Sequence, residues 1–223
     1  MKNILVLILA TIWFTDLKGQ QILVDQPFNG FSYYGKYSKI IESEGDLPNE
    51  IQTALEEYLT VMFGDNVKNI SFSHGQQVDL KGYFSETNRK SSSYHWLVPY
   101  YDLNYVLSDT TIGIKRYFLQ MRLDEYGQLL RTNWPRKGYS NLSHFPSPNK
   151  IVKVALNQAN ARGYWTYKFE TDLKFRDDSK SLNWVFKFPR TLKSDKKMFD
   201  VLEISLLTLK VVDEYTISTS TVN

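Results

Sequence analysis

Cysteine is absent from this 223-residue sequence. The fold therefore contains no disulfide bond, the chain offers no thiolate nucleophile, and a metal site would have to use other ligands. No cysteine is present to carry a lipid, so we expect no lipid anchor. With 42% hydrophobic and 15% aromatic residues, a chain of this length has enough apolar side chains to build a core without covalent crosslinks.

Histidine is scarce, and the motifs of common active sites are missing. The three histidines, His74, His95 and His144, form no H-x-x-x-H or H-x-H pattern, so we expect no metal site. Neither a G-x-S-x-G elbow nor a glycine-rich phosphate loop is present. We therefore expect no catalytic residue and no cofactor, and we expect that the protein is not an enzyme.

The chain also lacks a strong excess of either charge. A net charge of +3 is too small to indicate binding to nucleic acid or to an anionic membrane surface. Acidic pairs at 124–125, 177–178 and 213–214 fall in expected turns or strand ends near Lys or Arg. We expect these carboxylates to be solvated charges and not calcium ligands or acid–base groups.

Long hydrophobic runs are missing, with one exception near the N-terminus. Residues 4–14 are apolar, follow Lys2 and precede the polar Thr15 and Asp16. This run is shorter than the ~20 residues that a membrane-spanning helix needs. The order matches a secretion signal over residues 1–19, which predicts a periplasmic or secreted protein with no membrane anchor after cleavage. The missing A-x-A pattern leaves a buried N-terminal strand or helix as the alternative.

Two segments about a hundred residues apart begin alike and predict similar helices. After Leu47 and Pro48, apolar residues recur at helical spacing from Ile51 to Met62, and Gly64 follows. In the second segment Ser147 is the expected N-cap and Pro148 the first helical residue, with Gly163 at the end. This similarity indicates an internal duplication.

Strand patterns follow each predicted helix in the same order. We expect strands over 67–72, 103–106 and 117–123 in the first half, and over 165–175, 182–185 and 202–206 in the second. Polar turns, such as 193–196, join antiparallel neighbours. The first half carries an insert, roughly 73–93, whose residues 85–93 are typical of a solvated loop.

These elements predict an α+β fold made of two repeats, each with one helix packed on a three- to four-stranded antiparallel sheet. The expected organisation is a signal peptide (1–19), an N-terminal extension (20–46), a first repeat (47–134), a linker (135–146) and a second repeat (147–223). Residues 22–24 and 31–37 of the extension could add edge strands.

The arrangement resembles the PepSY-like family of exported bacterial proteins, in particular its tandem branch that is named after likeness to a β-lactamase inhibitor. The similarity is carried by Leu47 and Pro48 before the first helix and by residues 117–130, a strand, a turn at Gly127 and a return strand. Residues 207–210 depart from this pattern, so a different turn is expected there. The resemblance implies a non-catalytic module that binds or restrains other exported proteins, and it supplies no catalytic residues.

An aromatic segment is the candidate for partner binding. Exposed aromatic side chains make contacts with protein partners or sugars at low entropic cost. The alternative is that these side chains alternate into the core, as aromatic residues of strands commonly do. The sequence predicts a binding module for a protein or peptide in the cell envelope, inhibitory or regulatory; the alternative is an exported hydrolase or carbohydrate-binding protein. The candidate residues are Tyr94, Trp96, Tyr100, Tyr101 and Tyr105.

Overall fold

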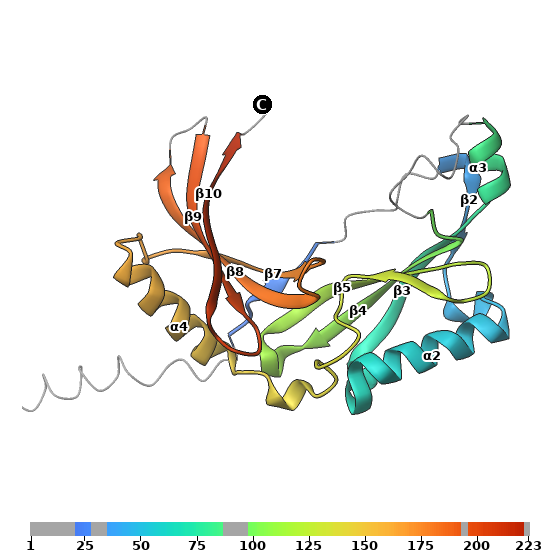
Figure 1. The fold of residues 1–223 in the computed structure, drawn as a ribbon, viewed down its shortest axis with the longest axis horizontal. Coiled ribbons are helices and arrows are strands. Elements are labelled where there is room, and N and C mark those ends of the chain that lie inside the picture. The colour runs from blue at the N-terminus through green and yellow to red at the C-terminus, as the bar shows by residue number, and fades with distance from the viewer. Residues whose placement is uncertain (1–20, 28–34, 87–97, 193–195, 221–223) are drawn as a thin grey trace, which may run out of the picture.

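The computed structural model describes residues 21–27, 35–86, 98–192 and 196–220. Within these ranges the chain forms three α-helices, a mixed six-stranded sheet and a separate four-stranded antiparallel sheet (Figure 1). The predicted α+β class is therefore confirmed. The predicted signal segment, residues 1–19, lies outside the described residues. None of the described helices has the length and apolar character required to cross a membrane.

The first sheet combines strands from the N-terminal extension and the first half of the chain. Its strands are β1 (Val24–Asp25), β2 (Ser38–Ile41), β3 (Ile70–Val78), β4 (Tyr101–Asp109), β5 (Ile114–Leu123) and β6 (Leu129–Thr132). The order is β1-β5-β4-β3-β2, and β6 also pairs with β5. All pairs are antiparallel apart from β1 with β5, which is parallel. The sheet is therefore mixed, whereas the sequence predicted an antiparallel one.

The second sheet is an antiparallel meander of four strands in the order β10-β9-β8-β7. These strands are β7 (Glu170–Arg176), β8 (Ser181–Leu192), β9 (Lys196–Ser205) and β10 (Val211–Ser220). Its edge strand β7 lies beside β1 of the first sheet, where the Thr171 hydroxyl donates a hydrogen bond to the carbonyl of Leu23. The two sheets therefore meet along a seam between β5, β1 and β7.

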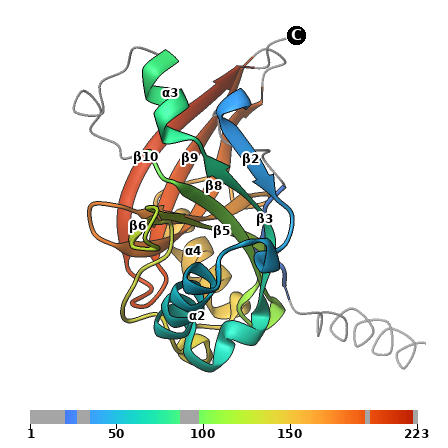
Figure 2. The same cartoon turned by 90° about the vertical axis from the view of Figure 1, so that its right-hand side faces the viewer.

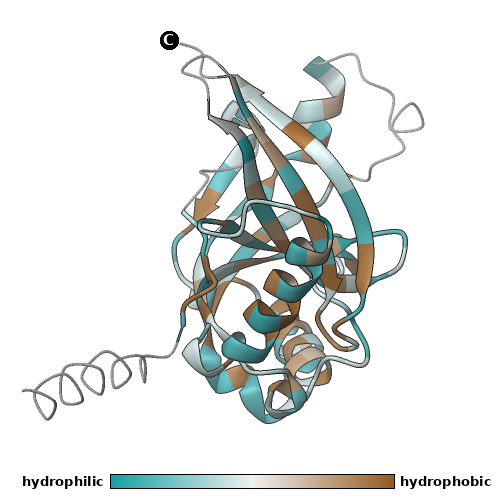
Figure 3. Ribbon diagram, turned by 90° about the vertical axis from the view of Figure 1, so that its left-hand side faces the viewer, coloured by the Kyte–Doolittle hydropathy of each residue, from teal (hydrophilic) through white to brown (hydrophobic). Residues whose placement is uncertain are grey.

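Two long helices cover the same side of these sheets (Figure 1). Helix α2 (Asn49–Phe63) lies under the first sheet and α4 (Pro148–Ala161) under the second. Hydrophobic and hydrophilic residues alternate along α4 and the strands (Figure 3), as amphipathic elements require. Buried side chains of both helices and both sheets form one contiguous hydrophobic cluster, so the two halves share a core.

A third helix, α3 (Leu80–Glu86), lies at the far end of the first sheet from α2 (Figure 2). Its Tyr83 packs on Val78 in a small hydrophobic cluster separate from the main core. The sequence predicted a loop over 85–93, so this prediction is wrong for Ser85 and Glu86, which end the helix. Leu80, Tyr83 and Phe84 supply apolar contacts that a polar loop pattern did not reveal.

The ends of both long helices follow the predicted signals. Gly64 follows α2 with φ 53°, a conformation that costs glycine little, and its N–H donates to the Thr60 carbonyl. Ser147 is the extended residue before α4, and Pro148 is its first residue. The two predicted helices are confirmed.

The two halves are not equal repeats. Each half runs through one long helix and then four strands, but the first sheet also includes β1 and β2, and the first half contains α3. The closing strands differ as well, since β6 has 4 residues and β10 has 10. The predicted pair of similar repeats is therefore correct only in its coarse order of elements.

Several strand boundaries differ from the predictions. Strand β7 begins at Glu170, so the predicted strand start at Trp165 is wrong; this segment lies outside the sheet, and the Thr166 hydroxyl bonds to Asn160 Oδ1 at 2.9 Å. Residues 64–69 form a 3-10 turn, and β3 begins only at Ile70. In the N-terminal extension, Gly35–Tyr37 is a 3-10 turn before β2, and residues 31–34 lie outside the described residues.

Residues 134–145 contribute a row of aromatic side chains to the core. Trp134 contacts the ring of Phe63 with centroids 4.8 Å apart, and Tyr139 lies between Trp134 and Phe145. The Tyr139 hydroxyl accepts a hydrogen bond from the Leu182 N–H at 3.3 Å. This connecting segment therefore ties α2 of the first half to β8 of the second.

The closing turns of the two halves each contain one residue with a positive φ, but that residue is a glycine in the first half and a leucine in the second. Gly127 has φ 82° between β5 and β6, which agrees with the predicted glycine turn. Leu209 has φ 56° between β9 and β10, an unusual conformation for a residue with a side chain. The predicted departure of residues 207–210 from the first turn is confirmed.

Candidate functional site

The two sheets present a common concave face on the side opposite α2 and α4 (Figure 1). Alternate strand residues point to this concave face, because neighbouring side chains of a strand lie on opposite sides of the sheet. The set is mainly polar and charged in the middle of the face, in contrast to the apolar side under the helices. It consists of Asp102, Asn104, Phe118, Gln120, Arg122, Asp172, Lys174, Asn183, Val185, Lys187, Val201, Glu203, Asp213 and Tyr215.

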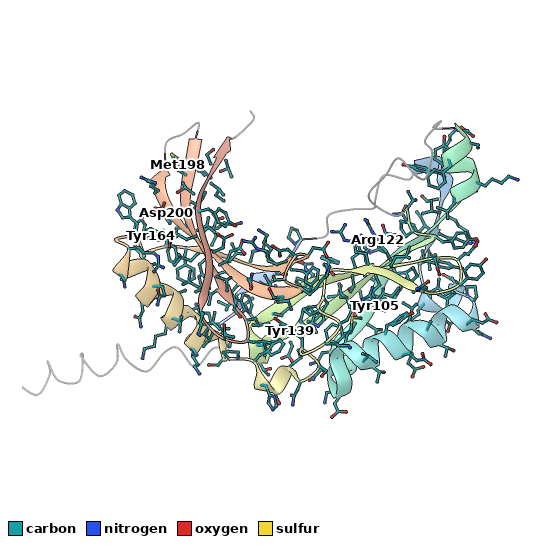
Figure 4. All side chains as sticks on the ribbon, in the orientation of Figure 1. Tyr105, Arg122, Tyr139, Tyr164, Met198 and Asp200 are labelled. Atoms are coloured by element: carbon teal, nitrogen blue, oxygen red, sulfur yellow. The ribbon has the colours of Figure 1, made fainter. Side chains whose placement is uncertain are left out.

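In the first sheet, a buried carboxylate orders its neighbours on the concave face. Asp102 of β4 lies directly opposite Arg122 of β5, and Asp102 Oδ2 is 3.5 Å from Arg122 Nε. Gln120 Nε2 donates to Asp102 Oδ1 at 2.9 Å. Figure 4 shows Arg122 on the concave side and Tyr105 on the side of α2. Because the Asp102 side chain is fully buried, these partners compensate a charge that water does not reach.

In the second sheet, Glu203 of β9 is the buried carboxylate that orders its neighbours. Its buried carboxylate accepts hydrogen bonds from Arg176 Nε at 2.7 Å, Lys174 Nζ at 2.9 Å and the Tyr215 hydroxyl at 2.8 Å. Arg176 also pairs with Asp213 of β10. Strands β7, β9 and β10 are thus joined on the concave face by one network of charged and polar side chains.

The network sets the ionisation of its members. Burial alone would raise the pKa of Glu203, but the hydrogen bonds from Arg176, Lys174 and Tyr215 outweigh burial and lower it below the ordinary glutamate value. Burial, followed by the hydrogen bond to the Glu203 carboxylate, raises the pKa of Tyr215 to about 12. At neutral pH the network therefore contains an ionised Glu203 carboxylate and a neutral Tyr215 phenol.

At the seam, side-chain amides form hydrogen bonds with the backbone groups of β5 that lie between its pairing with β1 and its pairing with β6. The Phe118 N–H donates to Gln26 Oε1 at 3.0 Å, and the Phe118 carbonyl accepts from Asn133 Nδ2 at 2.8 Å. The Gln120 N–H donates to Asn133 Oδ1 at 2.8 Å. Gln26 Nε2 also reaches Asp172 of β7 at 3.4 Å, so it links the two sheets.

Two adjoining hollows lie along this seam, and together they form what we call the seam groove. The first has a volume of about 530 Å³ and the second about 460 Å³. Asn104 and Glu170 line the first hollow, Tyr215 lines the second, and the residues common to both are Gln26, Gln120, Asn133, Asp172 and Lys187. The groove is therefore lined by side-chain amides, carboxylates, two lysines and two arginines, in positions fixed by both sheets.

Beyond the charged network, the concave face of the second sheet becomes apolar. Val185, Phe199 and Val201 form a buried cluster, and the half-buried Tyr215 and Ile217 of β10 pack against it. The face thus combines a polar groove with an apolar strip on the same sheet.

The predicted partner-binding aromatics occupy different environments. Tyr101 and Tyr105 are buried in the core on the side of α2, and the Tyr105 hydroxyl donates to Glu44 Oε1 at 2.8 Å. Tyr100 is half-buried, and its hydroxyl accepts from Gln77 Nε2 at 2.8 Å. Tyr94 and Trp96 lie outside the described residues. The core alternative therefore describes the positions of Tyr101 and Tyr105.

An exposed aromatic pair was missed by the sequence reasoning, which placed it in a strand. Trp165 and Tyr167 are 54% and 70% exposed, and their ring centroids are 6.1 Å apart. They follow α4 and precede β7, at the end of the molecule near Tyr164 (Figure 4). The pair presents the kind of surface on which proteins and sugars stack.

The three acidic pairs noted in the sequence make ion pairs or turn contacts. Asp177 pairs with Arg131 and Lys180, and Glu214 pairs with Arg162. Asp124 Oδ1 accepts from two backbone N–H groups of its turn. Within the described ranges, no group of three or more His, Asp or Glu side chains is placed to hold a metal ion.

Serine and histidine meet at one place on the concave face. Ser73 Oγ lies 3.0 Å from His74 Nδ1, at an irregularity in the pairing of β3 with β4. Burial lowers the pKa of His74, and the charge of Asp102 partly opposes that effect. The Asp102 carboxylate itself accepts from Gln120 and pairs with Arg122.

Comparisons of the chain with protein-family models, with curated proteins and with solved structures gave no match.

Proposed function

We propose that the protein is an exported, non-catalytic binding module that holds a protein or peptide partner on its concave face. The seam groove carries this proposal. Its polar side chains come from both sheets and are held by hydrogen bonds and ion pairs within the protein. Groups that are already fixed lose little conformational entropy when a partner binds, which favours affinity.

The chemistry of the groove fits a polypeptide. Amide side chains such as Asn133 and Gln26 pair with backbone groups of β5, and a polypeptide segment presents backbone groups of the same kind. The half-buried Tyr215 and Ile217 beside the groove add apolar contact area. Polar and apolar surfaces side by side, with an aromatic residue, are typical of protein interfaces.

The contacts around Ser73 and His74 favour a binding role over hydrolysis. In a serine hydrolase triad, the carboxylate orients the histidine and the serine hydroxyl bonds to the other ring nitrogen. In this protein the charge of Asp102 acts on His74, but Asp102 also pairs with Arg122 and accepts from Gln120, and Ser73 is the direct chain neighbour of His74. The alternatives from the sequence, an exported hydrolase or a carbohydrate-binding protein, have no comparable support in the groove.

The family resemblance and the export signal are part of the same proposal. The shared order of one long helix and four strands in both halves supports a duplication like that of tandem PepSY-like proteins. An inhibitory or regulatory role would follow from restraining the bound partner.

The test is capture of a partner from the native envelope fraction with immobilised protein. Lys187→Glu reverses a charge that lines both hollows of the groove. We expect the wild type to retain a partner and this variant to lose it, by about tenfold or more in affinity, since like charges at an interface are costly. Lys150→Glu makes the same charge change on the exposed surface of α4 and is the matched control.

The proposal fails if the wild type retains no partner, or if Lys187→Glu retains it as well as Lys150→Glu does. Equal thermal stability of the two variants is checked first, so that loss of binding is not loss of fold.

A further inference from the structure

A basic pocket adjoins the seam groove at the rim of the concave face. It has a volume of about 710 Å³ and lies between β6, the segment that follows β6, and the turn between β7 and β8. Among the described residues that line it are five cations and a single carboxylate, Asp177. The cations are Arg122, Arg131, Arg136, Lys137 and Lys180.

The fold itself brings two of these cations together. Arg122 of β5 and Arg131 of β6 lie directly opposite each other in the sheet, an arrangement that is unfavourable for like charges. Asp102 pairs with Arg122, and Asp177 pairs with both Arg131 and Lys180. Three of the cations therefore share two carboxylates as ion-pair partners.

The remaining two cations have no such partner. Arg136 donates to the Leu129 carbonyl at 2.8 Å, and neither Arg136 nor Lys137 forms an ion pair with a carboxylate in the described part of the chain. Both side chains are exposed. The five cations and one carboxylate of this pocket carry more net positive charge than the whole chain, whose net charge is only +3.

We propose that the basic pocket binds an acidic segment of the polypeptide that occupies the seam groove. This inference rests on the proposed function and adds the chemistry of the partner. Arginine guanidinium groups bind carboxylates through paired, geometrically matched hydrogen bonds, and a partly enclosed site strengthens them. The pocket is continuous with the groove, because Arg122, Arg131 and Asp177 line both.

The walls of the pocket favour a peptide over a bare oxyanion or a nucleic acid. Leu130, Pro135 and Phe175 give it apolar surface, which suits the methylene groups of glutamate side chains. Trp134 also lines it, and its indole N–H has no hydrogen-bond partner among the described residues. A nucleic acid strand would need a longer basic track along its phosphates.

The experiment measures binding of a fluorescent oligoglutamate peptide to the full protein by anisotropy at low salt. We expect saturable binding that weakens about tenfold or more in the double variant Arg136→Glu/Lys137→Glu, since each substitution reverses a charge. The matched control, Lys150→Glu/Lys153→Glu, makes the same change on the exposed side of α4 and should bind as the wild type does. An oligoglutamine peptide should not bind.

Three results would overturn the inference. These are equal binding to the two double variants, complete displacement of the peptide by inorganic phosphate at matched ionic strength, and tighter binding of a single-stranded oligonucleotide of equal charge. If oligoglutamate does not bind but Lys187→Glu still abolishes partner capture, only this inference fails. If oligoglutamate binds as expected while no partner depends on Lys187, the proposed function fails and the acidic-ligand pocket stands.

Discussion

At the scale of single residues, the concave face is organised by buried carboxylates. Asp102 and Glu203 occupy the two sheets, and each is surrounded by cationic and amide donors. A buried charge is costly unless every partner stays in place, so these two residues hold their neighbours in one arrangement. Such fixed polar groups are what a preorganised binding face requires.

Glu203→Gln should lower the free energy of unfolding by about 2 kcal/mol, because it leaves Lys174 and Arg176 without their shared carboxylate. The loss is at the low end for a buried pair, since those two side chains are 45% and 25% exposed and solvent screens them. Glu57→Gln on the exposed side of α2 is the control and should change stability little. Urea denaturation measures both; equal effects of the two substitutions would contradict the role of Glu203.

The stability difference between wild type and Glu203→Gln should depend on pH in a defined direction. The folded pKa of Glu203 lies below its unfolded value of about 4.3, so its stabilising contribution is fully present above that pH. It is lost as the pH falls through the lowered folded value. The stability difference between wild type and Glu203→Gln should therefore be constant near neutrality and shrink in acid; a difference that grows in acid would show that the sign is wrong.

At the scale of elements, tight turns connect strands that must lie side by side. Gly127, at φ 82°, joins β5 to β6, and a β-carbon at this position would lie 3.1 Å from Ile51 Cδ1 of α2. Gly138 has nearly the same backbone angle, φ 83°, but a β-carbon there would meet no atom within 4 Å. Substitutions at these two glycines therefore distinguish the cost of backbone strain from the cost of packing against α2.

Gly138→Ala should cost about 1 kcal/mol, the price of a left-handed conformation for a residue with a β-carbon. Gly127→Ala should cost about 1 kcal/mol more, since the added methyl group must also displace the side chain of Ile51. Chemical denaturation of the two variants gives the difference directly. Equal losses of stability in the two variants would contradict the close packing of the Gly127 turn against Ile51 of α2.

Elements with strong local signals were predictable from the sequence, whereas others depended on distant contacts. Helices α2 and α4 carry their periodicity and end signals in their own residues. The segment around Trp165 alternates like a strand but pairs with no strand in the described part of the chain, so it stays outside the sheet. The short α3 is stabilised by packing of Tyr83 on Tyr37 of the N-terminal extension, with ring centroids 5.7 Å apart, a contact that no local pattern encodes.

The candidate site was less predictable than the fold, for a physical reason. The polar residues Asp102 and Asn104 interrupt an apolar strand, and this was the available signal for a polar concave face. Their importance depends on register, which places Arg122 and Gln120 opposite them. Gln26 and Asn133, which complete the edge of β5, come from segments with no strand pattern.

At the scale of the whole molecule, the two halves share one hydrophobic core although their sheets are separate. The cluster runs from Leu55 of α2 through Trp134 and Tyr139 to Ile204 of β9. Residues that share a core lose their contacts together, so the protein should unfold in one cooperative transition. A linker that only tethered two independent repeats would give two.

Leu55→Ala and Ile204→Ala place one cavity in each half, at side chains that are fully buried. Each should lower the free energy of unfolding by roughly 2 to 5 kcal/mol, and both should shift the same single transition in calorimetry. A calorimetric enthalpy equal to the van't Hoff enthalpy in all three proteins would support one folding unit. Two transitions, each moved by only one of the substitutions, would show that the halves fold separately. If the halves form a single unit, a partner bound in the seam groove, as we propose, would stabilise the entire chain by bridging both sheets.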